Sequence, residues 1–156
     1  MASTFDPKRC IIIYGGVPLY GFGPGDFLTV TPAEAAWNAV SGADGEEARS
    51  KSNNKMATAT ISLMQTSTAN AVLSALYNAD VDTAGGRPTK NFAVTDLSGE
   101  SSFLESPAAW IIQPPDISFG TEIKNRDWQF QLTSVKFYIS GNADVAGSIL
   151  DGLSLP

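Results

Sequence analysis

The sequence predicts a mainly β protein, a β-sandwich or barrel with one flanking α-helix and a projecting loop, and three observations lead to this prediction. The segment Ala57–Leu63 alternates strictly between apolar and hydroxyl side chains, which is the period of a half-buried strand. Other short apolar runs are separated by clusters of glycine, proline and asparagine. Apolar residues fall at helical spacing in the segment Ala69–Asn78. Many short strands with one helix indicate a helix-flanked sheet.

The N-terminal part is predicted to begin with a β-hairpin. Cys10–Tyr14 and Val17–Tyr20 are apolar runs on either side of Gly15-Gly16, a pair typical of tight turns. Pro18 cannot donate a hydrogen bond to a ladder, so it belongs at the start of a strand or on an edge strand. The next predicted strands are Phe27–Val30 and Trp37–Val40.

A polar segment, residues 41–55, then interrupts the strands. Its Gly, Asp, Ser and Asn content favours turns over a packed element, and it leads directly into the alternating strand. We expect it to project as an arm in which Arg49 and Lys51 lie opposite Glu46 and Glu47. On a free surface these charges contribute little to stability, whereas at an interface they select partner and register; the sequence leaves both open. The arm residues are Gly42, Asp44, Glu46, Glu47, Arg49, Lys51, Asn53 and Asn54.

The C-terminal half is predicted to contain the helix and the remaining strands. Thr66, Ser67 and Thr68 are N-cap candidates for the helix, and residues 80–88 are expected to form a loop after it. The predicted strands are Phe92–Val94, Ser102–Leu104, Ala108–Ile112 and Asn125–Ser140, with a turn at Asp96–Gly99 and a stop at Pro114-Pro115. A change of parity near Thr133-Ser134 predicts a bulge or bend. Residues 141–156 read as a C-terminal tail of one domain, 1–156.

Alternation along the strands divides the side chains into an apolar set and a polar set. The predicted core contains Ile11, Ile13, Trp37, Ile61, Leu63, Leu73, Leu76, Trp110, Trp128 and Phe130. The polar parity of the two long strands contains Thr58, Thr60, Ser62, Gln129 and Gln131.

The composition argues against catalysis. The 156 residues include no histidine, which removes the commonest general base and every histidine-based metal site. Gly21–Gly25 lacks the spacing of a phosphate-binding loop, and Asp80 and Asp82 are too few for a calcium loop. The single cysteine, Cys10, excludes an internal disulfide, and we expect no signal peptide and no membrane helix. We therefore expect no enzyme, no metal and no cofactor.

The net charge of −6 is unsuited to gripping nucleic acid, although it suits a surface past which nucleic acid slides. The three tryptophans leave open a different class of function, a small acidic carbohydrate-binding domain, but their apolar strand contexts favour packing.

An ordered set of motifs resembles the inner tail tube proteins of contractile-tailed bacteriophages. The motifs are Asp6-Pro7-Lys8, Gly15-Gly16-Val17-Pro18, Gly42-Ala43-Asp44-Gly45-Glu46, Arg49-Ser50-Lys51-Ser52-Asn53-Asn54, Ile61-Ser62-Leu63-Met64-Gln65-Thr66-Ser67, Ala108-Ala109-Trp110-Ile111, Pro114-Pro115-Asp116-Ile117-Ser118-Phe119-Gly120 and Asn125-Arg126-Asp127-Trp128. They cover the chain from about Asp6 to Ser140.

The resemblance implies a virion structural protein that forms hexameric rings, which stack into a tube that conducts DNA. It also implies sheath, baseplate and tail terminator proteins as partners, with assembly in the host cytoplasm. Because the arm is polar, bounded by glycine and leads directly into a strand, we expect it to reach a neighbouring subunit and connect the rings. The polar set Thr58, Thr60, Ser62, Gln129 and Gln131 would then be candidates to line the channel. A tube protein of a tailocin or a secretion-type injection machine remains the nearest alternative.

Overall fold

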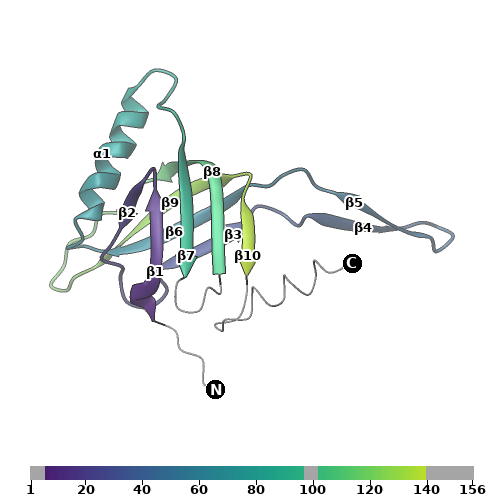
Figure 1. The fold of residues 1–156 in the computed structure, drawn as a ribbon, viewed down its shortest axis with the longest axis horizontal. Coiled ribbons are helices and arrows are strands. Elements are labelled where there is room, and N and C mark those ends of the chain that lie inside the picture. Colours follow the sequence, from purple (N-terminus) through teal and green to yellow (C-terminus); the bar gives the residue numbers. More distant parts are fainter. Residues whose placement is uncertain (1–5, 97–101, 140–156) are drawn as a thin grey trace, which may run out of the picture.

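The computed structural model describes residues 6–96 and 102–139, and its main feature is a curled antiparallel sheet (Figure 1). The strands are β1 Cys10–Tyr14, β2 Val17–Leu19, β3 Leu28–Pro32, β4 Trp37–Ser41, β5 Glu47–Lys51, β6 Ala57–Met64, β7 Lys90–Asp96, β8 Ser102–Gln113, β9 Asn125–Thr133 and β10 Lys136–Ile139, with the helix α1 at Ala69–Asp82 and a 3₁₀ turn at Pro7–Arg9. In the main sheet the strands hydrogen-bond in the order β2-β1-β7-β8-β9-β6-β3, and β10 also pairs with β8. In Figure 1, β1, β7, β8 and β10 cross in front of β3, β6 and β9. The predicted mainly β class with a flanking helix is confirmed.

The predicted N-terminal hairpin is present as β1 and β2. Its turn glycines, Gly15 and Gly16, have φ values of 61° and 83°, a region that glycine enters at no steric cost. Pro18 lies in β2, the strand at one end of the pairing order, where its missing N–H breaks no ladder. Both features follow from the local sequence.

The alternating segment forms β6 and pairs with β9. Its odd-numbered residues Ala57, Ala59, Ile61 and Leu63 are fully buried, and its even-numbered residues are half-buried. The register places Ile61 opposite Trp128 and Ala59 opposite Phe130, so the two strands present one continuous apolar face. This face forms one wall of the core.

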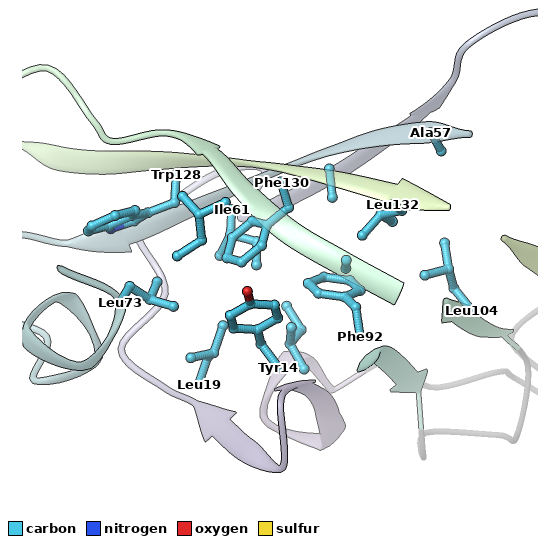
Figure 2. Packing of buried hydrophobic residues seen from close by; sticks show 14 of the residues in the cluster. Tyr14, Leu19, Ala57, Ile61, Leu73, Phe92, Leu104, Trp128, Phe130 and Leu132 are labelled. Carbon is cyan, nitrogen blue, oxygen red and sulfur yellow. The ribbon is translucent and has the colours of Figure 1, made fainter. Parts of the chain in front are cut away.

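The core lies inside the curl of the sheet, and Figure 2 shows its two walls. Trp128, Ile61 and Phe130 point toward Tyr14 and Phe92 from the opposite wall. The ring centroids of Tyr14 and Phe130 are 5.0 Å apart in an edge-to-face contact, and those of Phe92 and Phe130 are 5.4 Å apart. Burying one such side chain contributes about 1.5–3 kcal/mol. Closing the curl therefore yields much of the stability of the fold.

The helix α1 closes one end of the core. Leu73 is fully buried, whereas Val72 is 38% exposed and Leu76 packs at the margin of the core. The N-cap is Thr68, whose side chain makes no capping hydrogen bond; the backbone N–H of Ala69 donates instead to Ser67 Oγ at 3.2 Å. The predicted end at Asn78 was wrong, because the helix continues to Asp82. Asp80 and Asp82 thus lie in its last turn and not in a loop.

Two predicted strands, Ser102–Leu104 and Ala108–Ile112, are parts of the single strand β8. Register with β7 shifts between Lys90 and Phe92, which leaves an extra residue on β8 around Pro107. A bulge accommodates a proline that an unbroken ladder would not. The strand ends before Pro114-Pro115, as predicted.

The predicted bend at Thr133-Ser134 is confirmed, and it divides the predicted long strand into β9 and β10. Ser134 has a φ of 48°, the left-handed conformation that most residues avoid. Both strands pair with β8, β9 near Ala109 and β10 near Leu104. The predicted turn at Asp96–Gly99 begins at the last residue of β7 and otherwise lies outside the described residues, as does the predicted tail.

Several predicted core positions were wrong. Either the other face of the strand is buried, or the strand lies away from the core. In β1 the buried residues are Ile12 and Tyr14, whereas Ile11 is 37% exposed and Ile13 is half-buried. A run of apolar residues carries no period that selects its inner face. Trp110 on β8 is half-buried, and Trp37 is 47% exposed because β4 leaves the body of the fold. Ile61, Leu63, Leu73, Trp128 and Phe130 are buried as predicted.

Candidate assembly surfaces

The predicted arm is a two-stranded hairpin that projects from the body (Figure 1). β4 and β5 pair from Trp37 opposite Lys51 to Ser41 opposite Glu47, and every residue of both strands is exposed. The expectation that turns would replace regular structure was therefore wrong for Glu47–Lys51. The polar sequence hid this strand because neither of its faces is buried, and so it has no apolar alternation.

The turn of this hairpin follows from residues 42–46. The N–H of Gly42 donates to Glu46 O at 2.7 Å, and the N–H of Gly45 donates to Gly42 O at 3.0 Å. Asp44 Oδ1 accepts from the N–H of Glu46 at 3.1 Å, an Asx turn. Gly45 has a φ of 86°, which a residue with a Cβ rarely adopts. Gly42, Asp44 and Glu46 thus build the tip of the hairpin.

The side chain of Trp37 contacts the two cationic side chains of the hairpin. The guanidinium carbon of Arg49 lies 3.9 Å from the centroid of the Trp37 ring, and Lys51 Nζ lies 6.0 Å from it. Register places Lys51 opposite Trp37 and Glu47 opposite Ser41, so the expected opposition of Arg49 and Lys51 to the glutamates was wrong. A stack of a guanidinium on an indole contributes about 0.5–1 kcal/mol at an exposed site. It rigidifies a surface that the body of the fold does not cover.

Side-chain and backbone hydrogen bonds hold the root of the hairpin. Ser52 Oγ donates to Glu34 Oε1, and the Ser52 N–H donates to Ala36 O at 2.7 Å. Asn54 Oδ1 accepts from the N–H of Met56 at 3.1 Å. The Asn54 side chain thus binds a nearby backbone group, whereas Asn53 beside it is exposed.

The predicted polar set comes together on the face opposite the core. Thr58 pairs with Gln131, Thr60 with Gln129, and Ser62 with Asp127, whose carboxylate accepts from Ser62 Oγ at 2.6 Å. On the other side of β6, Thr31 pairs with Thr58 and Thr29 with Thr60. The result is a polar ladder across β3, β6 and β9, in which β3 contributes residues that the sequence reasoning missed. The alternation Leu28-Thr29-Val30-Thr31 carried this signal.

Acidic and cysteine side chains are the groups relevant to metal binding and to nucleophilic chemistry. Among residues 6–96 and 102–139, no group of three or more acidic or cysteine side chains could hold a metal ion. Burial, followed by the charges of Asp96 and Asp6, raises the pKa of the Cys10 thiol, which disfavours the nucleophilic thiolate form. In the same part of the chain, the one helix is too short and too polar to span a bilayer.

The tryptophans do not form a shared sugar platform. Trp128 is 2% exposed within the core, Trp37 lies on the hairpin and Trp110 on β8. Stacking on a sugar needs an accessible ring face, which the buried Trp128 does not offer.

The described residues combine a curled sheet and a flanking helix with an exposed projecting hairpin and a polar outer ladder, which is typical of a structural subunit. Comparison with known proteins agrees. The sequence model of the family described as Bacteriophage PhiTE tail tube protein matches residues 11–139. Structural protein ORF10 of Pseudomonas phage KPP10 is 29% identical over 158 residues, which cover 97% of this chain and 91% of that protein. The chain belongs to the phage tail tube family, and it is a structural component of the phage tail, as the motif resemblance predicted.

Solved structures share the fold at low sequence identity. A chain of the PVC sheath-tube complex of an extracellular contractile injection system, in the extended state, aligns with a TM-score of 0.58 at 9% identity over 87% of this chain and 92% of that chain. A chain of the tube-terminating cap of the anti-feeding prophage aligns with a TM-score of 0.56 at 11% identity over 90% of this chain and 94% of that chain.

Proposed function

We propose that this chain, acting as one tail-tube domain, assembles into hexameric rings that stack into the inner tube of a contractile tail and conduct DNA. The observation that carries this proposal is the hairpin β4–β5, in which every residue is exposed. An isolated two-stranded hairpin is at best marginally stable in water. Contact with a neighbouring copy would cover the hairpin and stabilise it, so the arm residues Gly42, Asp44, Glu46, Glu47, Arg49, Lys51, Asn53 and Asn54 are assigned to the contact between rings.

The sheet supports ring formation through its edges. The pairing order ends at β2 and β3, and an unpaired strand edge is a template for pairing with another chain. Pairing between copies would join the sheets into a closed barrel that has no free edge.

The polar ladder is the face proposed to line the channel, through Thr58, Thr60, Ser62, Gln129 and Gln131. These side chains are uncharged, and Asp127 adds a carboxylate beside Ser62. Duplex DNA carries one negative charge per about 1.7 Å, so a basic lining would hold it through many phosphates. Hydroxyls, amides and a carboxylate offer no such grip, and DNA would pass without stalling.

The proposed partners are the sheath, baseplate and terminator proteins of the tail, with assembly in the host cytoplasm. The fold is shared with chains of a sheath-tube complex and of a sheath/tube terminator, which supports these partners. Because those structures belong to an extracellular injection system, a tube that conducts another cargo is the second candidate function.

Electron microscopy of the purified chain tests the proposal. We expect hollow tubes of sixfold symmetry, with the hairpin against the next ring and the polar ladder facing the bore. A chain that stays monomeric at high concentration would overturn the tube. A bore lined instead by Lys8, Arg9, Lys124 and Arg126 would overturn the proposal that the channel lining does not bind DNA.

A further inference from the structure

An apolar pocket lies at the root of the projecting hairpin. Its volume is about 710 Å³, and its apolar lining is Pro32, Ala35, Ala36, Met56, Val135 and Phe137. We call it the root pocket. It lies where β6 begins and β9 ends, because Ala57 pairs with Leu132 and Met56 immediately precedes β6.

An exposed apolar loop lies at the other end of the same two strands. Residues 114–124 connect β8 to β9, and in this loop Ile117 is 75% exposed, Phe119 79% and Ile123 61%. Arg126 holds the loop against the strand: its guanidinium carbon lies 5.5 Å from the Phe119 ring centroid, and its Nη1 donates to Ser118 O at 3.4 Å. Large apolar side chains gathered on one exposed segment indicate an interaction site. We call this segment the apolar loop.

The two surfaces cannot meet within one molecule. β6 runs from Ala57 at the pocket end to Met64 at the loop end, where Met64 pairs with Asn125. At about 3.3 Å per residue, the strand separates the two surfaces by roughly 23 Å. The loop of one copy can therefore reach only the pocket of another.

The charges beside the two surfaces are complementary. Lys55 and Lys136 line the root pocket. In the apolar loop, Asp116 and Glu122 lie on either side of Ile117 and Phe119 along the chain and are exposed. The one cation of the loop, Lys124, is its last residue, seven positions from Ile117, so the charge next to Ile117 is that of Asp116. Opposite charges at the rim of an apolar contact select the partner and the register of the contact. The third charged residue of the pocket, Glu34, accepts a hydrogen bond from Ser52.

We propose that the apolar loop of one copy inserts Ile117 and Phe119 into the root pocket of a second copy, with Asp116 facing Lys55. The contact joins two different surfaces, so each copy can bind one neighbour at each end of β6 and β9. Such a head-to-tail contact propagates and yields rings or stacks. This inference rests on the proposed tube and names the surfaces that join its subunits.

Cross-linking tests the contact directly. Two proteins are made in a Cys10→Ser background, one with Ile117→Cys and one with Ala36→Cys, and they are mixed under mild oxidation. We expect a disulfide-linked species that contains one copy of each and forms only in the mixture. A second mixture pairs Ile117→Cys with Val81→Cys, an exposed helix position outside both surfaces, and should remain uncross-linked. Equal cross-linking in both mixtures, or none in either, would overturn the contact.

A charge exchange provides the second test. Asp116→Lys and Lys55→Glu should each raise the protein concentration needed for tube growth by at least about tenfold, and the double variant should restore it. Phe119→Ser should abolish growth, whereas Val81→Ser should leave it unchanged. If the wild-type chain forms tubes and Asp116→Lys, Lys55→Glu and Phe119→Ser form them equally well, the inference is wrong and the proposed function stands. A wild-type chain that never assembles would overturn both.

Discussion

The indole nitrogen of Trp128 donates a hydrogen bond of 2.9 Å to Asn70 Oδ1, which ties the central strand β9 to the first turn of α1. The same Asn70 side chain donates through Nδ2 to Met64 O at 2.9 Å and to Ser67 O at 3.2 Å. One amide thus provides hydrogen-bond partners for a carbonyl at the end of β6, a carbonyl in the turn that follows it and the buried indole N–H. These hydrogen bonds connect the first turn of α1 to β6 and β9.

Removing the Asn70 amide should destabilise the fold more than an ordinary surface change. Asn70→Ala leaves the indole N–H of Trp128 buried without its partner, and we expect a loss of about 1–3 kcal/mol in the free energy of unfolding. Denaturant unfolding measures this loss, with Asn78→Ala at an exposed position of the helix as control. In a double-mutant cycle with Trp128→Phe, additive losses would contradict the coupling between Asn70 and Trp128.

The buried face of α1 is predicted to depend on Leu73. Leu73→Ala should lower the free energy of unfolding by about 2–5 kcal/mol, because it leaves a cavity among fully buried neighbours. Leu76→Ala, at the margin of the core, should cost less. Val72→Ala is the matched control, since Val72 is 38% exposed. Equal losses at Leu73 and Val72 would show that the helix packs through another face.

The hairpin is predicted to act in assembly and to contribute little to the stability of the body. Arg49→Ala removes the stack on Trp37 and should shorten or abolish tubes while leaving the thermal midpoint nearly unchanged. Deletion of residues 44–52 should have the same effect in stronger form. Electron microscopy and calorimetry measure the two outcomes, with Arg87→Ala as control. Tubes of normal length from the deletion variant would contradict the assignment.

Stability above pH 10 should depend on Tyr14. Burial, followed by the charge of Asp80, raises the pKa of Tyr14 from 10.0 to about 12. The folded state therefore keeps a phenol proton that the unfolded state releases, so this contribution to stability is complete below pH 10 and is lost as the pH rises toward 12. Tyr14→Phe should reduce the alkaline loss of stability, whereas Tyr20→Phe, at an exposed position, should not. Identical pH profiles for wild type and Tyr14→Phe would contradict the shift.

The polar ladder should leave DNA unbound only while it lacks positive charge. Thr60→Lys combined with Gln129→Lys would add two cations per subunit to the proposed bore. Assembled tubes of this variant should retain duplex DNA at low salt and release it as salt rises, because phosphate contacts release counterions. Co-sedimentation measures this, with Val81→Lys on the helix as control. Retention of duplex DNA by wild-type tubes would contradict the proposal that the channel lining does not bind DNA.

Local patterns were sufficient for some elements because their evidence lies within the segment itself. The alternation from Ala57 to Leu63 specified both a strand and its buried face. Helical spacing around Leu73 specified the helix, although not its last turn at Asp82. Gly15-Gly16 specified a hairpin because few residues other than glycine adopt its φ values.

The amino-acid sequence was sufficient to predict the fold class, the alternating strand, the N-terminal hairpin and, through its ordered motifs, the family. Long-range packing selected Ile12 and not Ile11 for the core, because an unbroken apolar run has no period that selects a face. Only the structure showed that Glu47–Lys51 pairs with Trp37–Ser41, which leaves Trp37 outside the core. It likewise aligned Thr58 with Gln131. The buried face and the strand pairing each depend on contacts between distant segments. A local pattern shows which residues alternate, but not which residues they contact in the folded chain.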